Sequence, residues 1–169
     1  MGKFMRFSML CLAALALSAC NGSKEGDKAA AAPAVEQAPV TAPAGTDDKA
    51  WREYLMAVAK QHMKGIRNNP YMYYLPSAQD PEFDAKYTRQ LENVESVVAR
   101  TVLPGNMLAF GSPESGRMAD LVEVAFTEWA EANAFQGVRV LFIGKAEDRA
   151  RVEAAVQPSG AEFVFVEAK

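Results

Sequence analysis

Two residue types that often carry chemistry are scarce, because this chain of 169 residues has two cysteines and one histidine. Cys11 and Cys20 both lie in the first 20 residues, so no disulfide, cysteine metal cluster or cysteine nucleophile can form in the rest of the chain. The single histidine, His62, cannot by itself make a histidine-rich zinc site. No dinucleotide-binding fingerprint is present either, so we expect no metal and no cofactor.

An excess of basic residues is also missing. The formal net charge is −3 and the pI is about 5.3. From residue 47 onward there are 14 lysines and arginines against 18 aspartates and glutamates, a net charge of −4. Nucleic-acid-binding domains usually carry a clustered basic excess. We therefore expect no nucleic-acid partner.

No apolar run in the chain is long enough to span a bilayer. The longest, residues 7–17, is interrupted only by Ser8 and falls short of the roughly 20 residues that a membrane helix needs. Lys3 and Arg6 precede it, and small residues follow it. A basic start, a short apolar region and small residues at the end are typical of a secretory signal.

The signal ends in Leu17-Ser18-Ala19-Cys20, which resembles the lipobox of bacterial lipoproteins. The resemblance implies a diacylglyceryl group on Cys20, cleavage after Ala19 and acylation of the new amine. Several acyl chains give stable anchoring, since each buried methylene contributes about 0.8 kcal/mol. The residue after the cysteine is Asn21, not Asp, which implies transfer to the outer membrane, facing the periplasm. The alternative is an ordinary secretory signal with a chance cysteine.

A tether is expected after the lipidated cysteine. Residues 21–46 are rich in alanine and proline and contain no aromatic residue. Such a segment cannot bury enough apolar surface to offset its ordering entropy. We therefore divide the chain into a signal peptide (1–19), a lipidated and disordered tether (20–46) and a globular domain (47–169).

Within the domain, short apolar runs alternate with helical periodicity. A first helix is predicted from a Thr46 cap to the stop at residues 68–70, and later helices open at two cap-proline pairs, Asp80-Pro81 and Ser112-Pro113. The apolar runs, at residues 71–75, 107–110, 138–143 and 163–166, are mostly continuous rather than alternating. This order predicts a small three-layer α/β domain, Rossmann-like or flavodoxin-like. Its mainly parallel sheet would have three or four strands, and one helix precedes it.

Candidate ligand-binding residues follow from the rule that open parallel sheets bind ligands at the carboxyl ends of their strands. The loop Gly111–Arg117 half-resembles a phosphate-binding loop, but Arg117 and Met118 stand where that motif needs Lys and Ser or Thr. The hypothesis is an anion site formed by Ser112, Ser115, Gly116, Arg117 and Lys145. The alternative is plain capping of the helix, with Lys145 solvated.

Other candidates also have two interpretations. Tyr71, Tyr73 and Tyr74 are either partner-binding residues, as tyrosine often is at interfaces, or strand residues that cover the core. His62 is expected on the helical face of Val58, packed at the sheet. Arg151, together with Arg149 and nearby acids, is expected on a solvated helix face.

The function favoured by these patterns is a non-catalytic protein-binding module, lipid-anchored and facing the periplasm. Assembly factors, inhibitors and immunity proteins share that general architecture. Its partner would be another envelope protein. We lean against an enzyme because no nucleophile–base pair is recognisable. The alternatives are a small enzyme or anionic-ligand-binding domain that uses Gly111–Arg117, and a structural spacer.

The lipobox predicts that Cys20→Ser releases the protein from the membrane, because the thioether to the lipid can no longer form. Fractionation of the native host and mass spectrometry of the mature N-terminus measure this. An unmodified Cys20 in the mature wild-type protein would contradict the anchor.

Overall fold

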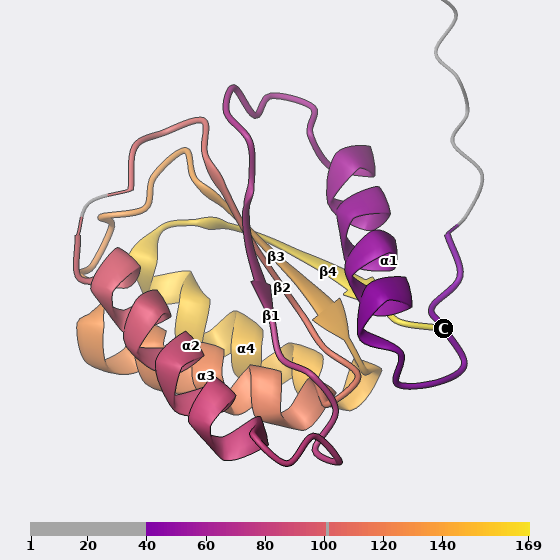
Figure 1. Cartoon of the computed structure of the whole chain (residues 1–169). Helices are drawn as coiled ribbons and strands as arrows, with labels where there is room; N and C mark the ends of the chain where they lie inside the picture. Colours follow the sequence, from indigo (N-terminus) through magenta and orange to yellow (C-terminus); the bar gives the residue numbers. More distant parts are fainter. Residues whose placement is uncertain (1–39, 101) are drawn as a thin grey trace, which may run out of the picture. The chain divides into compact units, whose positions relative to one another are not determined.

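The structure, a computed structural model, describes residues 40–100 and 102–169 (Figure 1). These residues form four α-helices and a four-stranded, all-parallel sheet. The predicted α/β fold of the Rossmann-like or flavodoxin-like kind is therefore confirmed. The predicted signal peptide, Cys20 and most of the predicted tether lie outside the described residues.

The elements alternate as the sequence pattern predicts, and all four apolar runs form strands. Their order along the chain is α1 (Asp48–Gln61), β1 (Tyr71–Tyr74), α2 (Phe83–Val98), β2 (Met107–Gly111), α3 (Ser115–Trp129), β3 (Arg139–Gly144), α4 (Arg149–Val156) and β4 (Glu162–Glu167). Two short 3₁₀ turns, at Ala146–Asp148 and Gln157–Ser159, flank α4.

The strands lie in the spatial order β1-β2-β3-β4, and each pairs in parallel with the next. Because β-α-β crossovers are right-handed, three crossovers in one direction place α2, α3 and α4 on the same face of the sheet (Figure 1). The core on that face includes Phe110 and Phe142 from the strands, with Val94, Leu121 and Val152 from the helices. In the described sheet the strand order never reverses, so it lacks the switch point at which doubly wound folds bind ligands.

The opposite face of the sheet is covered by α1. Its buried side chains Trp51, Leu55 and Val58 pack against the two central strands, through Met107, Ala109, Leu141 and Ile143. A helix is about 10 Å wide, whereas strands lie about 4.8 Å apart. One helix therefore covers about two of the four strands. It leaves the two outer strands of this face, β1 and β4, without cover from α1.

On the β4 flank the chain itself supplies the cover. Val40 and Ala42 pack against the same core as Val164 and Val166, and the Ala42 N–H donates to the Lys169 carbonyl at 2.7 Å. The folded unit thus extends N-terminally of residue 47, the predicted start of the domain, because these small apolar residues bury surface that α1 leaves open.

The helix starts differ from the prediction in a consistent way. The cap of α1 is Asp47, whose carboxylate accepts the Ala50 N–H at 2.8 Å, so the predicted Thr46 cap was wrong. Asp80 and Ser112 accept the N–H two residues ahead, at 2.8 and 2.9 Å. They form tight turns, and α2 and α3 begin after these turns.

The end of α1 was predicted too late. The helix stops at Gln61, and Gly65 turns the chain at a φ of 86°. The Arg139 guanidinium donates to the carbonyls of His62 and Lys64. It therefore supplies hydrogen-bond donors to carbonyls at the end of the helix. His62 is therefore the C-cap, not a helical residue on the face of Val58. Burial and the nearby Arg139 charge lower its pKa.

The contact between α1 and β2 predicts a strong effect of Gly111→Ala. An added Cβ would lie 2.2 Å from one Leu55 methyl carbon and 3.2 Å from the other. Leu55 is fully enclosed, so we expect a loss of about 1–3 kcal/mol from the free energy of unfolding. Urea denaturation measures it. Gly45→Ala is the control, since nothing lies within 4 Å of its Cβ position, and equal effects of both variants would refute the packing argument.

Candidate functional site

The loop after β2 is tied to the loop after β1. The Ser112 hydroxyl donates to the Leu75 carbonyl at 2.9 Å and accepts the Glu114 N–H. The Glu114 carboxylate accepts from the Ala78 N–H at 2.9 Å and from the Ser77 hydroxyl at 3.3 Å. Both Ser112 and Glu114 therefore hold neighbouring loops together.

Ser115 makes the corresponding link to the loop after β3. Its hydroxyl donates to the Asp148 carboxylate at 2.6 Å and accepts the Lys145 N–H at 2.8 Å. A Cβ on Gly144 would lie 2.5 Å from that oxygen, so glycine is required there. Ser115 and Asp148 are both buried. The Ser115 hydroxyl thus already has a donor and an acceptor inside the fold.

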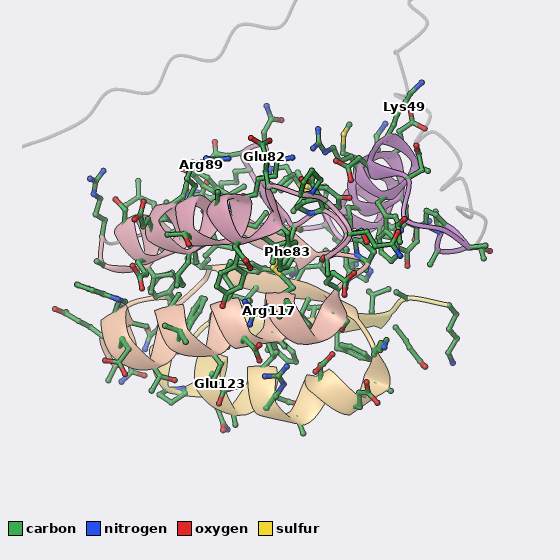
Figure 2. All side chains as sticks on the ribbon, turned by 60° about the horizontal axis from the view of Figure 1, so that its bottom comes forward. Lys49, Glu82, Phe83, Arg89, Arg117 and Glu123 are labelled. Atoms are coloured by element: carbon green, nitrogen blue, oxygen red, sulfur yellow. The ribbon has the colours of Figure 1, made fainter. Side chains whose placement is uncertain are left out.

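Arg117 points away from the loop. Its guanidinium lies 4.2 Å from the Tyr87 ring centroid and 5.9 Å from that of Phe83, and it pairs with Asp120 at 3.4 Å. Figure 2 shows Arg117 beside Phe83, between α2 and α3. The Gly116 carbonyl accepts from Arg151 at 2.7 Å. Gly116 and Arg117, both predicted anion ligands, therefore make their contacts with the helices α2, α3 and α4.

The structure therefore brings together three of the five predicted ligand residues. Ser112, Ser115 and Lys145 line a cleft of about 410 Å³ at the carboxyl ends of the strands, which residues 41–44 also line. The Lys145 side chain is 64% exposed and lies 3.8 Å from Glu147. The cleft brings one exposed ammonium group near two serine hydroxyls that are already hydrogen-bonded.

Arg151 makes more ion-pair contacts than the sequence pattern indicated. It was expected on a solvated face, but its guanidinium contacts Asp120 at 2.6 Å, Glu123 at 3.2 Å and the buried Asp148 at 2.9 Å. Burial alone would lower the Arg151 pKa, but the hydrogen bonds to Asp120 and Asp148 outweigh it and raise the pKa. This cluster joins α3 to α4.

The three tyrosines of β1 lie in different environments. Tyr71 is 47% exposed, whereas Tyr73 is 4% exposed and stacks on Phe110 with ring centroids 4.8 Å apart. The Tyr73 hydroxyl has no hydrogen-bond partner among the described residues. Tyr74 is half-buried and donates to Asp48 at 2.8 Å. Burial is the main reason that the Tyr73 and Tyr74 pKa values are raised.

A different surface, at the outer edge of β1, is hollowed. Three depressions share lining residues along this edge and occupy about 580, 320 and 340 Å³. We name them together the β1 groove. Its methionine section is lined by Met56, Met63 and Met72, its middle by Arg52, Tyr74 and Gln90, and its cationic end by Lys86 and Arg89.

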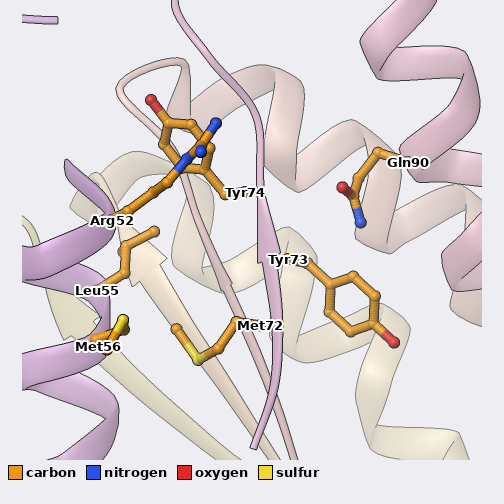
Figure 3. A pocket seen from close by; sticks show the side chains of 7 residues that line it. All are labelled: Arg52, Leu55, Met56, Met72, Tyr73, Tyr74 and Gln90. Atoms are coloured by element: carbon orange, nitrogen blue, oxygen red, sulfur yellow. The ribbon is translucent and has the colours of Figure 1, made fainter. Parts of the chain in front are cut away.

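The β1 groove lies where α1 leaves the sheet uncovered. Figure 3 shows Met56 on α1 and Met72 on β1 projecting into the space between the two elements, with Gln90 of α2 on the other side of the strand. Met56 is 63% exposed. Met72 packs only partly against the α1 core. Next to β4 the segment with Ala42 bonds to Lys169, whereas the described residues leave the flank next to β1 open.

The charged side chains that line the β1 groove are all cationic: Arg52, Lys60, Lys86 and Arg89. Lys86 pairs with Asp80 and, at 3.5 Å, with Glu82, and the bond to Asp80 raises its pKa. Arg89 takes part in none of the ion pairs found among the described residues, and Figure 2 shows it projecting from α2. Arg52 pairs with Asp48 at 3.4 Å, so Lys60 and Arg89 are the groove cations that lie outside the ion pairs found among the described residues.

Compared with family models, with curated proteins and with solved structures, the chain matches none. Within residues 40–100 and 102–169, no group of three or more His, Cys, Asp or Glu side chains could hold a metal ion. No helix there combines the length and the apolar composition needed to cross a membrane.

The methionine section was missed in the sequence. The sequence pattern predicts the first helix but gives no role to Met56, which lies off the buried face of Trp51, Leu55 and Val58. The available signal was the spacing of Met56, Met63 and Met72, which places three methionines around the end of one helix and the start of the next strand. Without the strand order, nothing indicated that this strand lies at an edge.

The Asp148 cluster predicts a large effect of Asp148→Asn on stability. The amide would leave the Arg151 guanidinium and the Ser115 hydroxyl without their shared carboxylate. We expect a loss of about 2–4 kcal/mol from the free energy of unfolding, measured by urea denaturation. Glu147→Gln is the matched control, because its carboxylate is exposed and should change stability by less than about 0.5 kcal/mol. Similar losses in both variants would contradict this assignment.

Proposed function

We propose that this protein is a lipid-anchored envelope lipoprotein that binds another envelope protein through the β1 groove and catalyses no reaction. The observation that carries the proposal is the open apolar flank between α1 and β1. Methionine side chains are polarisable and adaptable, and they are common on binding surfaces. A contiguous apolar surface of this kind on a domain is typical of an interaction site.

The anchor is proposed from the lipobox residues Leu17-Ser18-Ala19-Cys20. Asn21 favours the periplasmic face of the outer membrane. A flexible tether of the length of residues 21–39, which precede the folded unit, would average roughly 22–26 Å end to end. Its reach would let the domain meet a partner away from the lipid surface.

The anionic-ligand hypothesis has less support from the contacts at the carboxyl-end cleft. The Ser112 and Ser115 hydroxyls both donate to groups within the protein, and Arg117 lies over Tyr87. An anion there would have to displace these bonds or rely on Lys145. By contrast, the β1 groove offers side chains that no other described element covers.

Site-specific photocrosslinking in the native envelope tests the proposal. The photoreactive amino acid p-benzoylphenylalanine replaces Met56 in the full lipoprotein. We expect one discrete protein adduct, which Met72→Asp then removes. The matched control position is Val124, which is exposed but lies on α3, far along the chain from the β1 groove.

An adduct of equal yield from position 124 would contradict the proposal, because binding would not be confined to the β1 groove. The absence of any protein adduct from position 56 would contradict it as well. If position 56 gave only a lipid adduct, the partner at the β1 groove would be the membrane rather than a protein.

A further inference from the structure

The outer side of β1 is a free sheet edge. β1 pairs only with β2 among the described strands. In a parallel ladder alternate residues direct their N–H and C=O groups to opposite sides, so about half of the β1 backbone groups point away from β2. Met72, Tyr73 and Tyr74 of this strand line the β1 groove.

The two edges of the sheet are protected differently. Edge strands commonly carry charges or proline, which discourage pairing with another chain. β4 begins with Glu162 and ends with Glu167, whereas the β1 sequence Tyr-Met-Tyr-Tyr has neither charge nor proline. Pro70 and Pro76 flank β1, so the stretch that can pair with a further strand is confined to its four residues.

The side chains of β1 alternate between two environments. Met72 and Tyr74 belong to the α1 side of the sheet, and Tyr73 belongs to the α2 side. Figure 3 shows this alternation directly. A strand added beside β1 would alternate in the same way. One set of its side chains would face Met56 and Met63, and the other would face the α2 side near Arg89.

We propose that the β1 groove takes an extended segment of the partner protein, which joins the sheet as a fifth strand beside β1. The segment carries apolar side chains toward the methionine section and acidic side chains toward Arg89 and Lys86. This inference rests on the proposed function and adds the binding mode. Strand addition of this kind obtains affinity from main-chain hydrogen bonds and specificity from pockets for alternate side chains.

The cationic end favours an acidic segment over a second copy of this chain. Two copies joined edge to edge at β1 would bring Arg89, which is outside the ion pairs found among the described residues, near the cationic end of the other copy. Like charges placed together across an interface suppress pairing. The chain's own residues 21–39 fit poorly too, because Pro33 and Pro39 have no N–H to donate to a ladder.

Peptide binding to the full lipoprotein in detergent tests the proposal. The probe is a capped heptapeptide of alternating valine and glutamate. Two matched probes replace glutamate by lysine, or carry N-methyl groups on alternate backbone nitrogens. Binding is followed by fluorescence anisotropy and by methyl NMR of methionine, with the buried Met107 and Met118 as internal references.

We expect the glutamate probe to shift the methyl signals of Met56, Met63 and Met72 and to leave those of Met107 and Met118 in place. The lysine probe and the N-methylated probe should each bind at least about tenfold more weakly. Arg89→Glu should weaken the glutamate probe about fivefold or more. Lys49→Glu, an exposed change on α1 outside the groove, is the control and should leave affinity unchanged.

Several outcomes overturn the inference. If the N-methylated probe binds as tightly, the partner does not add as a strand, although the photocrosslinking result for the proposed function would stand. If no probe binds, or if Lys49→Glu acts like Arg89→Glu, the acidic segment is wrong. Protein self-association that protects the β1 amides would identify a second copy as the occupant. Loss of that protection on deletion of residues 21–39 would identify the tether.

Discussion

The packing of one helix, α1, across one face of a four-stranded sheet determines which parts of that face are covered and which are exposed. The other face receives α2, α3 and α4, because three right-handed crossovers run in the same direction. α1 is seated closely on β2, where Leu55 takes the space that a side chain on Gly111 would fill. Since it covers the central strands only, two apolar flanks remain.

The two flanks of the α1 face differ. Beside β4, the Ala42 N–H donates to the Lys169 carbonyl, and Val40 and Ala42 pack against the same core as Val164 and Val166. Beside β1, the described chain supplies no such cover, and Met56 remains exposed. The carboxyl-end cleft, where α/β domains often act on ligands, is instead held together by Ser115, Asp148 and Arg151.

The sequence predicted the fold class well, because continuous apolar runs such as residues 138–143 and proline-marked helix starts are local signals. Helix ends were less predictable: the α1 stop depends on Gly65 and on Arg139, which is distant in the chain. Among candidate residues, Tyr73 and Arg117 were found by residue type. However, the burial of Tyr73 depends on Phe110 of β2, and the direction of Arg117 depends on Tyr87 of α2. The β1 groove needed the strand order, which no local pattern encodes.

The central claim is that a partner completes the flank beside β1. Hydrogen exchange measured by mass spectrometry compares the protein in native envelopes with the purified protein. The account predicts slower exchange of the β1 amides, Tyr71–Tyr74, in envelopes and unchanged exchange in β4, Glu162–Glu167. Equal exchange of β1 in both preparations would contradict it.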